Sequence, residues 1–401
     1  MADLTILNDK VSVAVAEHDG SWQKRQQMLN AIEELRIAAL GPADYVAGLR
    51  YQALQNMGIA MVLEMNLLTP IVDRHGAQIT ADEVAEASGS DKSLTVRLLR
   101  LLSSLHLITE LSAGIYRSNA NTVYLSHKSR TGAHKFLNIP TLNVMANAVP
   151  YMRAHGGRFP QFPDKEKGEK GLAEWTHGMS LWELFRAQPE VLRDFSDYLG
   201  GRREDMVGYW FDIWPTKEKI GRGMNAMAPE NDGQVLVVDV GGNVGYDLQA
   251  FRKRFPEFVG RGRLNLQDLR ENIEKAEILL EGTGIEAMEY DFFNAQPIKG
   301  ASIYYFGGIF HDWSDAQALS ILRNVAAAMS PVSRIIIDEM PLPDEKASLS
   351  LVQYDLLMMI NVNGIERTFG HYRELLSQAG LEIVDVWRTQ LDTVLEVKLV
   401  A

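Results

Sequence analysis

The stretch YYFGGIFHDWSD, residues 304–315, places a histidine at the end of a short apolar run. Histidine titrates near neutral pH, so His311 could take a proton from a substrate hydroxyl. A carboxylate such as Glu339 or Glu366 could hold the imidazole in the tautomer that this step needs. The alternative is a structural histidine at a strand end, and this stretch alone does not decide between the two.

A second candidate is the turn VVDVGGNVG, residues 237–245. Glycines between a strand and a helix let backbone N–H groups approach a ligand closely. The carboxylate of Asp239 could bond an amine or a hydroxyl of that ligand. An ordinary strand-to-helix turn has a similar composition, so this motif is weak evidence by itself.

Two acidic positions follow further along the chain. Asp268 ends the next apolar run, where a carboxylate could accept hydrogen bonds from both hydroxyls of a ribose. It could also cap the helix predicted over RENIEKAE, and both roles can hold together. Asp291 could accept the exocyclic amine of an adenine while Phe292 stacks on the base, although Phe292 could equally be a core residue.

These side chains need a sheet that brings the ends of several strands together. From residue 234 onward, apolar runs such as QVLVVDVGG and SRIIIDEMPL alternate with helical stretches such as DAQALSILRNVAAAM. This alternation predicts an open, largely parallel α/β sheet. In such sheets ligands bind at the carboxyl ends of the strands, which is where the candidate residues fall.

The N-terminal part has a different pattern. Residues 45–68 are predicted as a helical stretch, and the following segment reaches from a capping box at Thr80 and Glu83 to a hairpin over LHLITELSAGIYRSN. Helix, turn, helix and hairpin form a winged-helix pattern. DNA binding is disfavoured because the chain has a net charge of −12, so we expect this unit to be a packing module.

Composition sets the remaining bounds. A chain of 401 residues is too long for one ordinary core. It has no cysteine, which excludes disulfides and fits a reducing compartment. The first 30 residues lack the pattern of a signal peptide, and no apolar run is long enough for a membrane span. We expect a soluble, cytoplasmic protein with no nucleic-acid or membrane partner and, since no ligand cluster has useful spacing, no metal.

Together these motifs resemble the S-adenosylmethionine (SAM)-dependent O-methyltransferases of the caffeate and fungal secondary-metabolite type. The likeness covers nearly the whole chain, and the motifs that carry it are VVDVGGNVG, LQDLRENI, EYDFFNAQP, HDWSD, IIIDEMPLP and NGIERTFGHYRELLSQAGL. The resemblance implies an α/β fold class, with a C-terminal Rossmann-like methyltransferase domain and a mainly α-helical N-terminal winged-helix dimerisation domain. The domains would be residues 1–130 for dimerisation, 131–230 as a helical linker and substrate-pocket region, and 231–401 for SAM binding.

The resemblance also implies a role for each candidate residue. The catalytic residues would be His311 as general base, flanked by Glu339 and Glu366. The cofactor-binding residues would be Asp239, Gly241, Gly242, Gly245, Asp268, Asp291 and Phe292. Substrate-binding residues would be Met358, Met359 and Asn361, since flexible methionines suit an apolar ring system, although the methionines could also be plain helix core. The implied reaction is methyl transfer to a hydroxyl of a small aromatic or polyketide-derived molecule by a homodimer.

Three positions depart from the family pattern, one of which is Tyr246, where a histidine is common. Asn243 replaces the middle glycine of the cofactor loop, and Gly307 replaces the arginine or lysine that the family usually has beside the cofactor. Some relatives of this fold, the O-methyltransferase-like pericyclases, catalyse a dehydration or cycloaddition without methyl transfer. The alternative function is therefore a pericyclase in natural-product biosynthesis, with SAM retained unconsumed or lost.

Overall fold

The computed structural model describes residues 3–160, 162–163, 167–206, 209–220, 234–259, 262–388 and 392–400, without the side chains of 200–206 and 259. The chain divides into two compact units. One comprises residues 1–147 and 179–204, and the other comprises residues 148–178 and 205–401. The predicted three-domain division stays a prediction, and its boundary at residues 230 and 231 lies outside the described residues.

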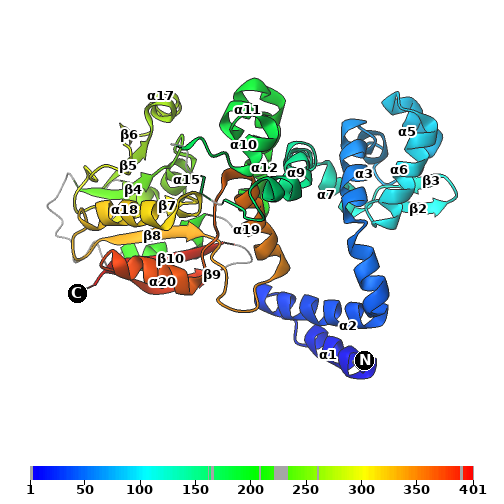
Figure 1. Cartoon of the computed structure of the whole chain (residues 1–401), viewed down its shortest axis with the longest axis horizontal. Helices are drawn as coiled ribbons and strands as arrows, with labels where there is room; N and C mark the ends of the chain where they lie inside the picture. Colours follow the sequence, from blue (N-terminus) through cyan, green and yellow to red (C-terminus); the bar gives the residue numbers. More distant parts are fainter. Residues whose placement is uncertain are drawn as a thin grey trace. The chain divides into compact units, whose positions relative to one another are not determined.

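The second unit contains a seven-stranded sheet with the order β6-β5-β4-β7-β8-β10-β9 (Figure 1). The strands are β4 (Val235–Val240), β5 (Arg263–Asp268), β6 (Ile285–Glu289), β7 (Ile303–Gly307), β8 (Arg334–Glu339), β9 (Leu381–Arg388) and β10 (Thr393–Leu399). Strands β4 to β8 run parallel to one another, whereas β10 runs antiparallel to both β8 and β9. The α/β fold class and the largely parallel sheet are confirmed.

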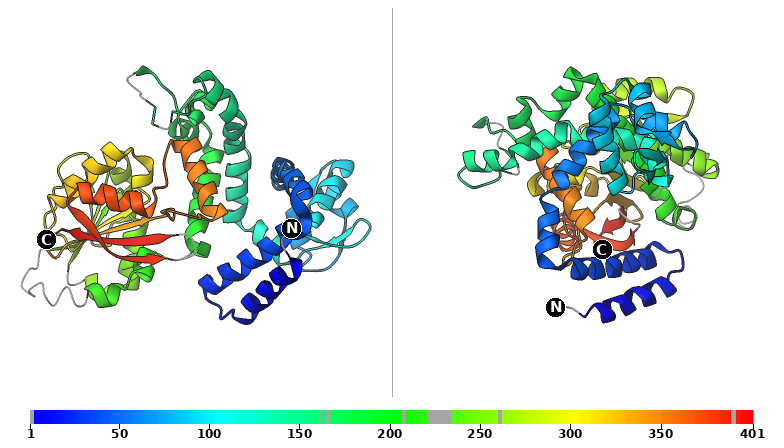
Figure 2. Two further views of the ribbon diagram at one scale, coloured as in Figure 1. Left: turned by 60° about the horizontal axis from the view of Figure 1, so that its bottom comes forward. Right: turned by 90° about the vertical axis from the view of Figure 1, so that its right-hand side faces the viewer.

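Two of these strands were not expected from the sequence. Strand β6 has a half-buried, weakly apolar sequence at one edge. Strand β9 alternates exposed and covered residues at the other edge, where it forms the red antiparallel pair with β10 in Figure 2. Edge strands need fewer apolar residues than central strands, so their sequences lack the continuous apolar run that marks β4, β7 and β8.

Helices cover both faces of this sheet. On one face, α18 (Asp315–Ala326) and α20 (Phe369–Gln378) pack their apolar sides against β7, β8 and β10. On the other face, α13 (Trp210–Ile213), α15 (Tyr246–Arg254) and α17 (Arg270–Leu279) form the second core cluster. Burial on both faces explains why the central strands are continuously apolar. The remaining elements of this unit are the turn η2 (Phe310–Asp312) and the helices α10 (Leu172–His177), α16 (Pro256–Val259) and α19 (Leu349–Val362).

The strand order reverses between β4 and β7. From β4 the chain builds outward through β5 to β6, then returns to add β7 and β8 on the other side of β4. The connections that leave the carboxyl ends of β4 and β7 therefore diverge and open a crevice, which is the usual ligand position in such sheets. The glycine turn and His311 follow these two strands.

The first unit is helical with one small sheet. Its helices are α1 (Leu4–Ala16), α2 (Trp22–Leu49), α3 (Gln52–Glu64), α4 (Leu68–Val72), α5 (Ala81–Ser88), α6 (Lys92–Ser104), α7 (Ala120–Ser126), α8 (Lys128–Asn138), α11 (Leu181–Ala187) and α12 (Pro189–Met206). Helix α9 (Pro140–Ala154) contains the boundary between the units. Strands β1 (Ile79–Thr80), β2 (Thr109–Ser112) and β3 (Ile115–Arg117) pair in the order β1-β3-β2.

The winged-helix pattern is confirmed at the level of its elements. The capping box of Thr80 and Glu83 begins α5, and Gly89 ends it in the left-handed conformation. Helix α6 follows, and β2 and β3 then form the antiparallel hairpin. The helical stretch expected over residues 45–68 is confirmed, and it is divided between consecutive helices, since α2 ends at Leu49 and α3 covers Gln52–Glu64.

The helices can also be compared with the requirements for spanning a membrane. None of those in the described part of the chain combines the length and the apolar character that crossing a bilayer requires.

Candidate functional site

The glycine turn after β4 has the backbone that its sequence predicts. Gly241 and Gly245 have φ angles of 75° and 80°, a region that favours glycine. A Cβ atom at position 242 would lie 2.6 Å from Oδ1 of Asp239, so glycine there lets the backbone pass over that buried carboxylate. Asn243 also has a positive φ of 54°, which asparagine tolerates better than most residues.

Asp268 ties this turn to the end of β5. Its Oδ2 accepts the backbone N–H of Asn243 at 2.8 Å, and its Oδ1 accepts the N–H of Leu269 at 2.7 Å and the side-chain amide of Asn272 at 2.8 Å. The residue at the N-cap of α17 is Leu269, so Asp268 is not the simple helix cap considered above. A carboxylate has about four acceptor positions, and these three donors leave room for one more on Oδ2.

Phe292 lies beside the glycine turn. Its Cε1 is 3.8 Å from the position of a Cβ atom on Gly241, and its half-buried ring packs edge-to-face on Trp313 at 5.6 Å. Asp291 is exposed and accepts the backbone N–H of Phe293 at 3.0 Å. The structure therefore brings Phe292 next to the predicted cofactor loop and places Asp291 on the adjoining turn.

His311 lies in η2, four residues after the end of β7. Its Nδ1 is 2.8 Å from Oε1 of Glu366, and its side chain is almost fully buried. Oε1 of Glu339 accepts the backbone N–H groups of Phe310 at 2.5 Å and His311 at 3.3 Å. The predicted trio is thus one connected group, in which Glu366 holds the ring and Glu339 holds the turn.

The second ring nitrogen, Nε2, lies near Gly308 and Asp312. A Cβ atom on Gly308 would lie 3.7 Å from Nε2 of His311, an ordinary contact distance. Asp312, which the sequence analysis did not single out, has Oδ1 at 3.7 Å from the same nitrogen. Its position next to His311 in the motif was the available signal. With Nδ1 engaged by Glu366, Nε2 is the nitrogen that could exchange a proton with a ligand.

The charges around the ring hold a proton on it. Burial by itself lowers the pKa of His311, but the hydrogen bond and the charge of Glu366, with the charges of Glu339 and Asp312, outweigh burial and raise the pKa to about 9. Burial also raises the pKa of Glu339, against the lowering effects of His311 and of the hydroxyl that Tyr372 donates to Oε2. Since the imidazolium stabilises both glutamates, we infer that the ring is cationic in the free protein at neutral pH.

A fully buried arginine anchors the same turn. Arg367 donates Nη2 to the carbonyl of Trp313 at 2.6 Å and Nε to Oδ1 of Asp315 at 3.0 Å, and it also donates Nη1 to the carbonyl of Phe310. The sequence analysis did not single it out, although an arginine directly after Glu366 was the available signal. Because guanidinium donors form a rigid fork, Arg367 fixes the path of residues 310–315 through these contacts.

Helix α19 connects the predicted substrate residues to this group. Asp355 accepts the backbone N–H of Glu366 at 2.9 Å. Met358, Met359 and Asn361 are half-buried on this helix, whose one buried residue is Ile360. The methionines are therefore not plain core, and their assigned role in substrate binding stays a prediction.

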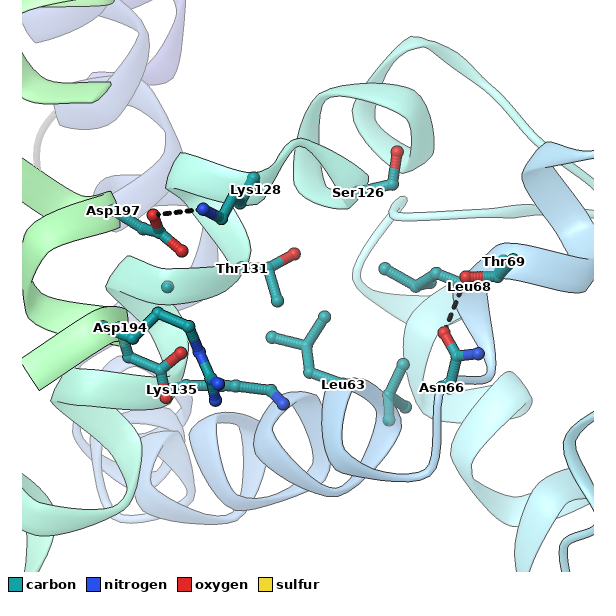
Figure 3. A pocket seen from close by; sticks show the side chains of 13 residues that line it. Leu63, Asn66, Leu68, Thr69, Ser126, Lys128, Thr131, Lys135, Asp194 and Asp197 are labelled. Carbon is teal, nitrogen blue, oxygen red and sulfur yellow. Dashed lines mark hydrogen bonds and ion pairs between the residues drawn. The ribbon is translucent and has the colours of Figure 1, made fainter. Parts of the chain in front are cut away.

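A cavity of about 380 Å³ lies within the first unit and is shown in Figure 3. Its lining is polar, and Lys128 pairs there with Asp197 at 2.9 Å. All of its lining residues belong to the first unit, whereas every predicted catalytic and cofactor residue belongs to the second unit. No group of three or more potential metal ligands was found among the residues that the structure describes.

Comparison with known proteins decides the family. A model of the O-methyltransferase domain matches residues 226–382. The O-methyltransferase penC of Penicillium thymicola is 31% identical over 373 residues, which span 92% of this chain and 88% of that protein. The chain belongs to the O-methyltransferase family. Demethylsterigmatocystin 6-O-methyltransferase of Aspergillus parasiticus is 28% identical over 384 residues, covering 95% of this chain and 94% of that protein. The predicted family is confirmed.

Solved structures share the fold of this O-methyltransferase family member. A protein described as a pericyclic reaction enzyme superposes with a TM-score of 0.81 at 22% identity, over 99% of both chains. OxaC, solved with sinefungin and meleagrin, superposes with a TM-score of 0.79 at 23% identity, over 99% of this chain and 98% of its own. LepI, solved with SAM, superposes with a TM-score of 0.80 at 22% identity, over 99% of this chain and 98% of its own. The fold is therefore shared with a protein described as a pericyclic reaction enzyme and with proteins solved in complex with SAM or sinefungin.

The protonation of His311 can be measured directly by NMR titration of the nine histidines, with His311→Asn used to assign the signal. We expect the ring to lose its proton near pH 9, against about 6.5 for an ordinary histidine. Because the folded pKa lies above the unfolded one, the stabilisation from this proton is complete below pH 6.5 and is lost as the pH rises through 9.

Glu366→Gln removes the main charge that raises this pKa and keeps the burial that lowers it. The His311 pKa should therefore fall below that of the wild type. A wild-type ring that titrates near 6.5, or a Glu366→Gln variant with an unchanged pKa, would contradict the described electrostatics.

Arg367→Met tests the anchor of the turn. It leaves the carbonyl of Trp313 without its arginine donor and takes one of two donors from the buried carbonyl of Phe310, so the free energy of unfolding should fall by about 1–3 kcal/mol. Arg373→Met on the following helix α20 is the control, because Arg373 is 65% exposed and lies 3.8 Å from Asp344, and it should change stability by less than about 0.5 kcal/mol. Denaturant titration of both variants measures the difference, and equal small effects would rule out the anchoring role.

Proposed function

We propose that this family member is a SAM-dependent O-methyltransferase that methylates a hydroxyl of a small aromatic or polyketide-derived molecule. The observation that carries the proposal is the buried group of His311, Glu339 and Glu366 at the carboxyl end of β7. It lies across the topological switch point from the glycine turn that follows β4. A candidate proton acceptor and a glycine turn thus lie at the same sheet edge, which is the usual position of a ligand in such sheets.

The residues at this edge fit the proposed cofactor. Oδ2 of Asp268 has acceptor capacity for a ribose hydroxyl, and Phe292 offers an aromatic face beside the backbone of Gly241. Gly242 keeps the turn free of side-chain bulk above Asp239. When bound, SAM supplies an electrophilic methyl group on a positively charged sulfur. Asn243 does not disrupt the turn, since its backbone N–H is held by Asp268.

In the proposed mechanism, the protein aligns the acceptor hydroxyl and removes its proton. Glu366 holds Nδ1 of His311, so Nε2 accepts the proton from the substrate oxygen. A cation held near the ring lowers its pKa below the value of the free protein, which makes the ring a base at neutral pH. A positioned base contributes a factor of about 10²–10⁴, and alignment contributes up to about 7–11 kcal/mol.

Helix α19 is the proposed wall of the substrate site. Its residues Met358, Met359 and Asn361 are half-buried, and the chain that leaves it returns to His311, whose carbonyl accepts the N–H of Ile365 at 2.7 Å. Helix α10 packs on α19, since a Cβ atom on Gly171 would lie only 2.5 Å from Cγ of Asn363. A substrate that contacts α19 would therefore be held at a fixed distance from the base.

Calorimetry with SAM and with S-adenosylhomocysteine tests the cofactor, and mass spectrometry of reactions with a panel of phenols tests the transfer. We expect binding of both ligands and formation of a product that is one methyl group heavier, together with S-adenosylhomocysteine. His311→Asn should lower turnover by about 10²–10⁴. His371→Asn is the control, because His371 forms a similar histidine–carboxylate contact with Asp315 at 2.8 Å; it should keep its turnover. No ligand binding near millimolar concentration would exclude the transferase.

A pericyclase is the second candidate, favoured by the absence of a charged side chain at Gly307. Retained SAM would then act as a fixed positive charge. The same mass spectrometry separates the two functions, because a pericyclase gives a product with an unchanged carbon count and no S-adenosylhomocysteine. Its turnover would not require a base at position 311.

We also propose that the chain forms a homodimer through its first unit. Helices α1 and α2 lie side by side as an antiparallel pair (Figure 2). Helix α1 has no buried residue, and α2 has only Ala31. Apolar side chains remain exposed along both helices, among them Leu4, Ile6, Val13, Val15, Leu29, Ile32, Val46 and Leu49. A helix pair that exposes many apolar side chains and buries almost nothing of its own needs a partner surface, and the family resemblance indicates a second copy.

Light scattering after size-exclusion chromatography tests this dimer. The wild type should have twice the mass of one chain, and the double variant Ile6→Glu and Val13→Glu should shift towards a single chain, because it places charge on the exposed apolar side. Ile278→Glu on α17 is the control, since Ile278 is 77% exposed in the other unit. A wild type with the mass of one chain would refute the dimer.

A further inference from the structure

The space beside Gly307 is filled by a tyrosine of the same strand. Residues 305 and 307 share one face of β7, because side chains alternate along a strand. A Cβ atom on Gly307 would lie 2.9 Å from Cζ of Tyr305 and still closer to its hydroxyl oxygen. Any side chain at position 307 would therefore displace the hydroxyl of Tyr305 from where it lies.

The ring of Tyr305 is held in place by packing. It is 2% exposed and stacks on Trp210, with centroids 5.0 Å apart and planes at 25°. Strand β7 lies between β4 and β8 near the middle of the sheet. The position of the hydroxyl is thus set by a rigid ring on a central strand.

This hydroxyl contacts two carboxylates from different elements. Oη lies 3.0 Å from Oδ2 of Asp247 and 3.3 Å from Oδ2 of Asp338. Asp247 is in the first turn of α15, directly after the glycine turn. Asp338 precedes Glu339 on β8, and its backbone carbonyl accepts the N–H of Gly308 at 3.0 Å. One hydroxyl therefore joins the helix after the cofactor turn to the strand end that holds the His311 turn.

We propose that Tyr305 is a positioning residue that sets the spacing between the glycine turn and the His311 turn. Glycine at position 307 is required by this arrangement, because a side chain there would occupy the position of the Tyr305 hydroxyl. The inference deepens the proposed function, on which its ligand-binding part rests. It also assigns a specific role to the departure at position 307, where the strand supplies a neutral hydroxyl between two carboxylates.

Hydrogen–deuterium exchange on the full chain tests the positioning without any ligand. Tyr305→Phe keeps the stacked ring and removes the hydroxyl, so peptides that cover residues 241–247 and 307–312 should both exchange faster. Tyr304→Phe is the matched control, because Tyr304 is an equally buried neighbour whose hydroxyl donates to the carbonyl of Ile298 at 2.7 Å. The control should leave both peptides unchanged. Unchanged exchange in Tyr305→Phe, or equal changes in the two variants, would overturn the proposal.

Calorimetry with S-adenosylhomocysteine then tests the consequence for the cofactor. Loss of a hydrogen bond to a charged group should raise the Kd about tenfold in Tyr305→Phe and leave it unchanged in Tyr304→Phe. In the wild-type background, Gly307→Ala should raise the Kd for S-adenosylhomocysteine. In the Tyr305→Phe background, the same substitution should raise this Kd less than twofold further, since both changes remove the same contact. Additive effects of the two substitutions would contradict the shared contact. If the wild type does not bind the ligand, the proposed function fails, while the exchange experiment still decides the role of Tyr305.

Discussion

The arrangement of the site depends on burying the carboxylate of Glu339 without losing its hydrogen bonds. A buried charge is costly unless donors and opposite charges surround it. Glu339 is 4% exposed, and it accepts two backbone N–H groups from the His311 turn and the hydroxyl of Tyr372 on α20. These donors come from the turn after β7 and from α20. Satisfying one carboxylate therefore fixes a turn and a helix at the end of β8. The catalytic chemistry that we propose uses a geometry that stability already requires.

At this sheet edge, the His311 side is held by charged groups and the glycine-turn side by backbone geometry. The His311 ring and Glu366 form a buried ion pair, and Arg367 holds the turn by donating to its backbone carbonyls. On the cofactor side, the contacts are mostly backbone geometry, with Gly242 over Asp239 and Asn243 held by Asp268. The switch point between β4 and β7 brings these two halves together. Position 307 lies between them, and the strand has no charged side chain there.

Much of the second unit could be predicted from its sequence, because central strands buried on both faces have continuous apolar runs that end in polar residues. The strand ends in turn located Asp239, Asp268 and His311 correctly on one sheet edge. Strands β6 and β9 were missed because edge strands carry little apolar sequence. Arg367 and Tyr305 were missed for another reason: their roles depend on which distant groups they contact, and neither residue type marks such contacts. The helical character of residues 45–68 could be predicted, but its interruption at residues 50–51 could not, because the sequence there lacks a breaker.

A crystal structure of the full chain with S-adenosylhomocysteine tests the central claim most directly, namely that the edge formed by β4, β5 and β7 is one nucleoside site beside the base. The account predicts a ribose hydroxyl within hydrogen-bond distance of Asp268, the adenine against Phe292, and the sulfur on the side of the ring that carries Nε2 of His311. An adenosyl group bound anywhere else, or a saturated crystal with this edge closed by side chains, would contradict it.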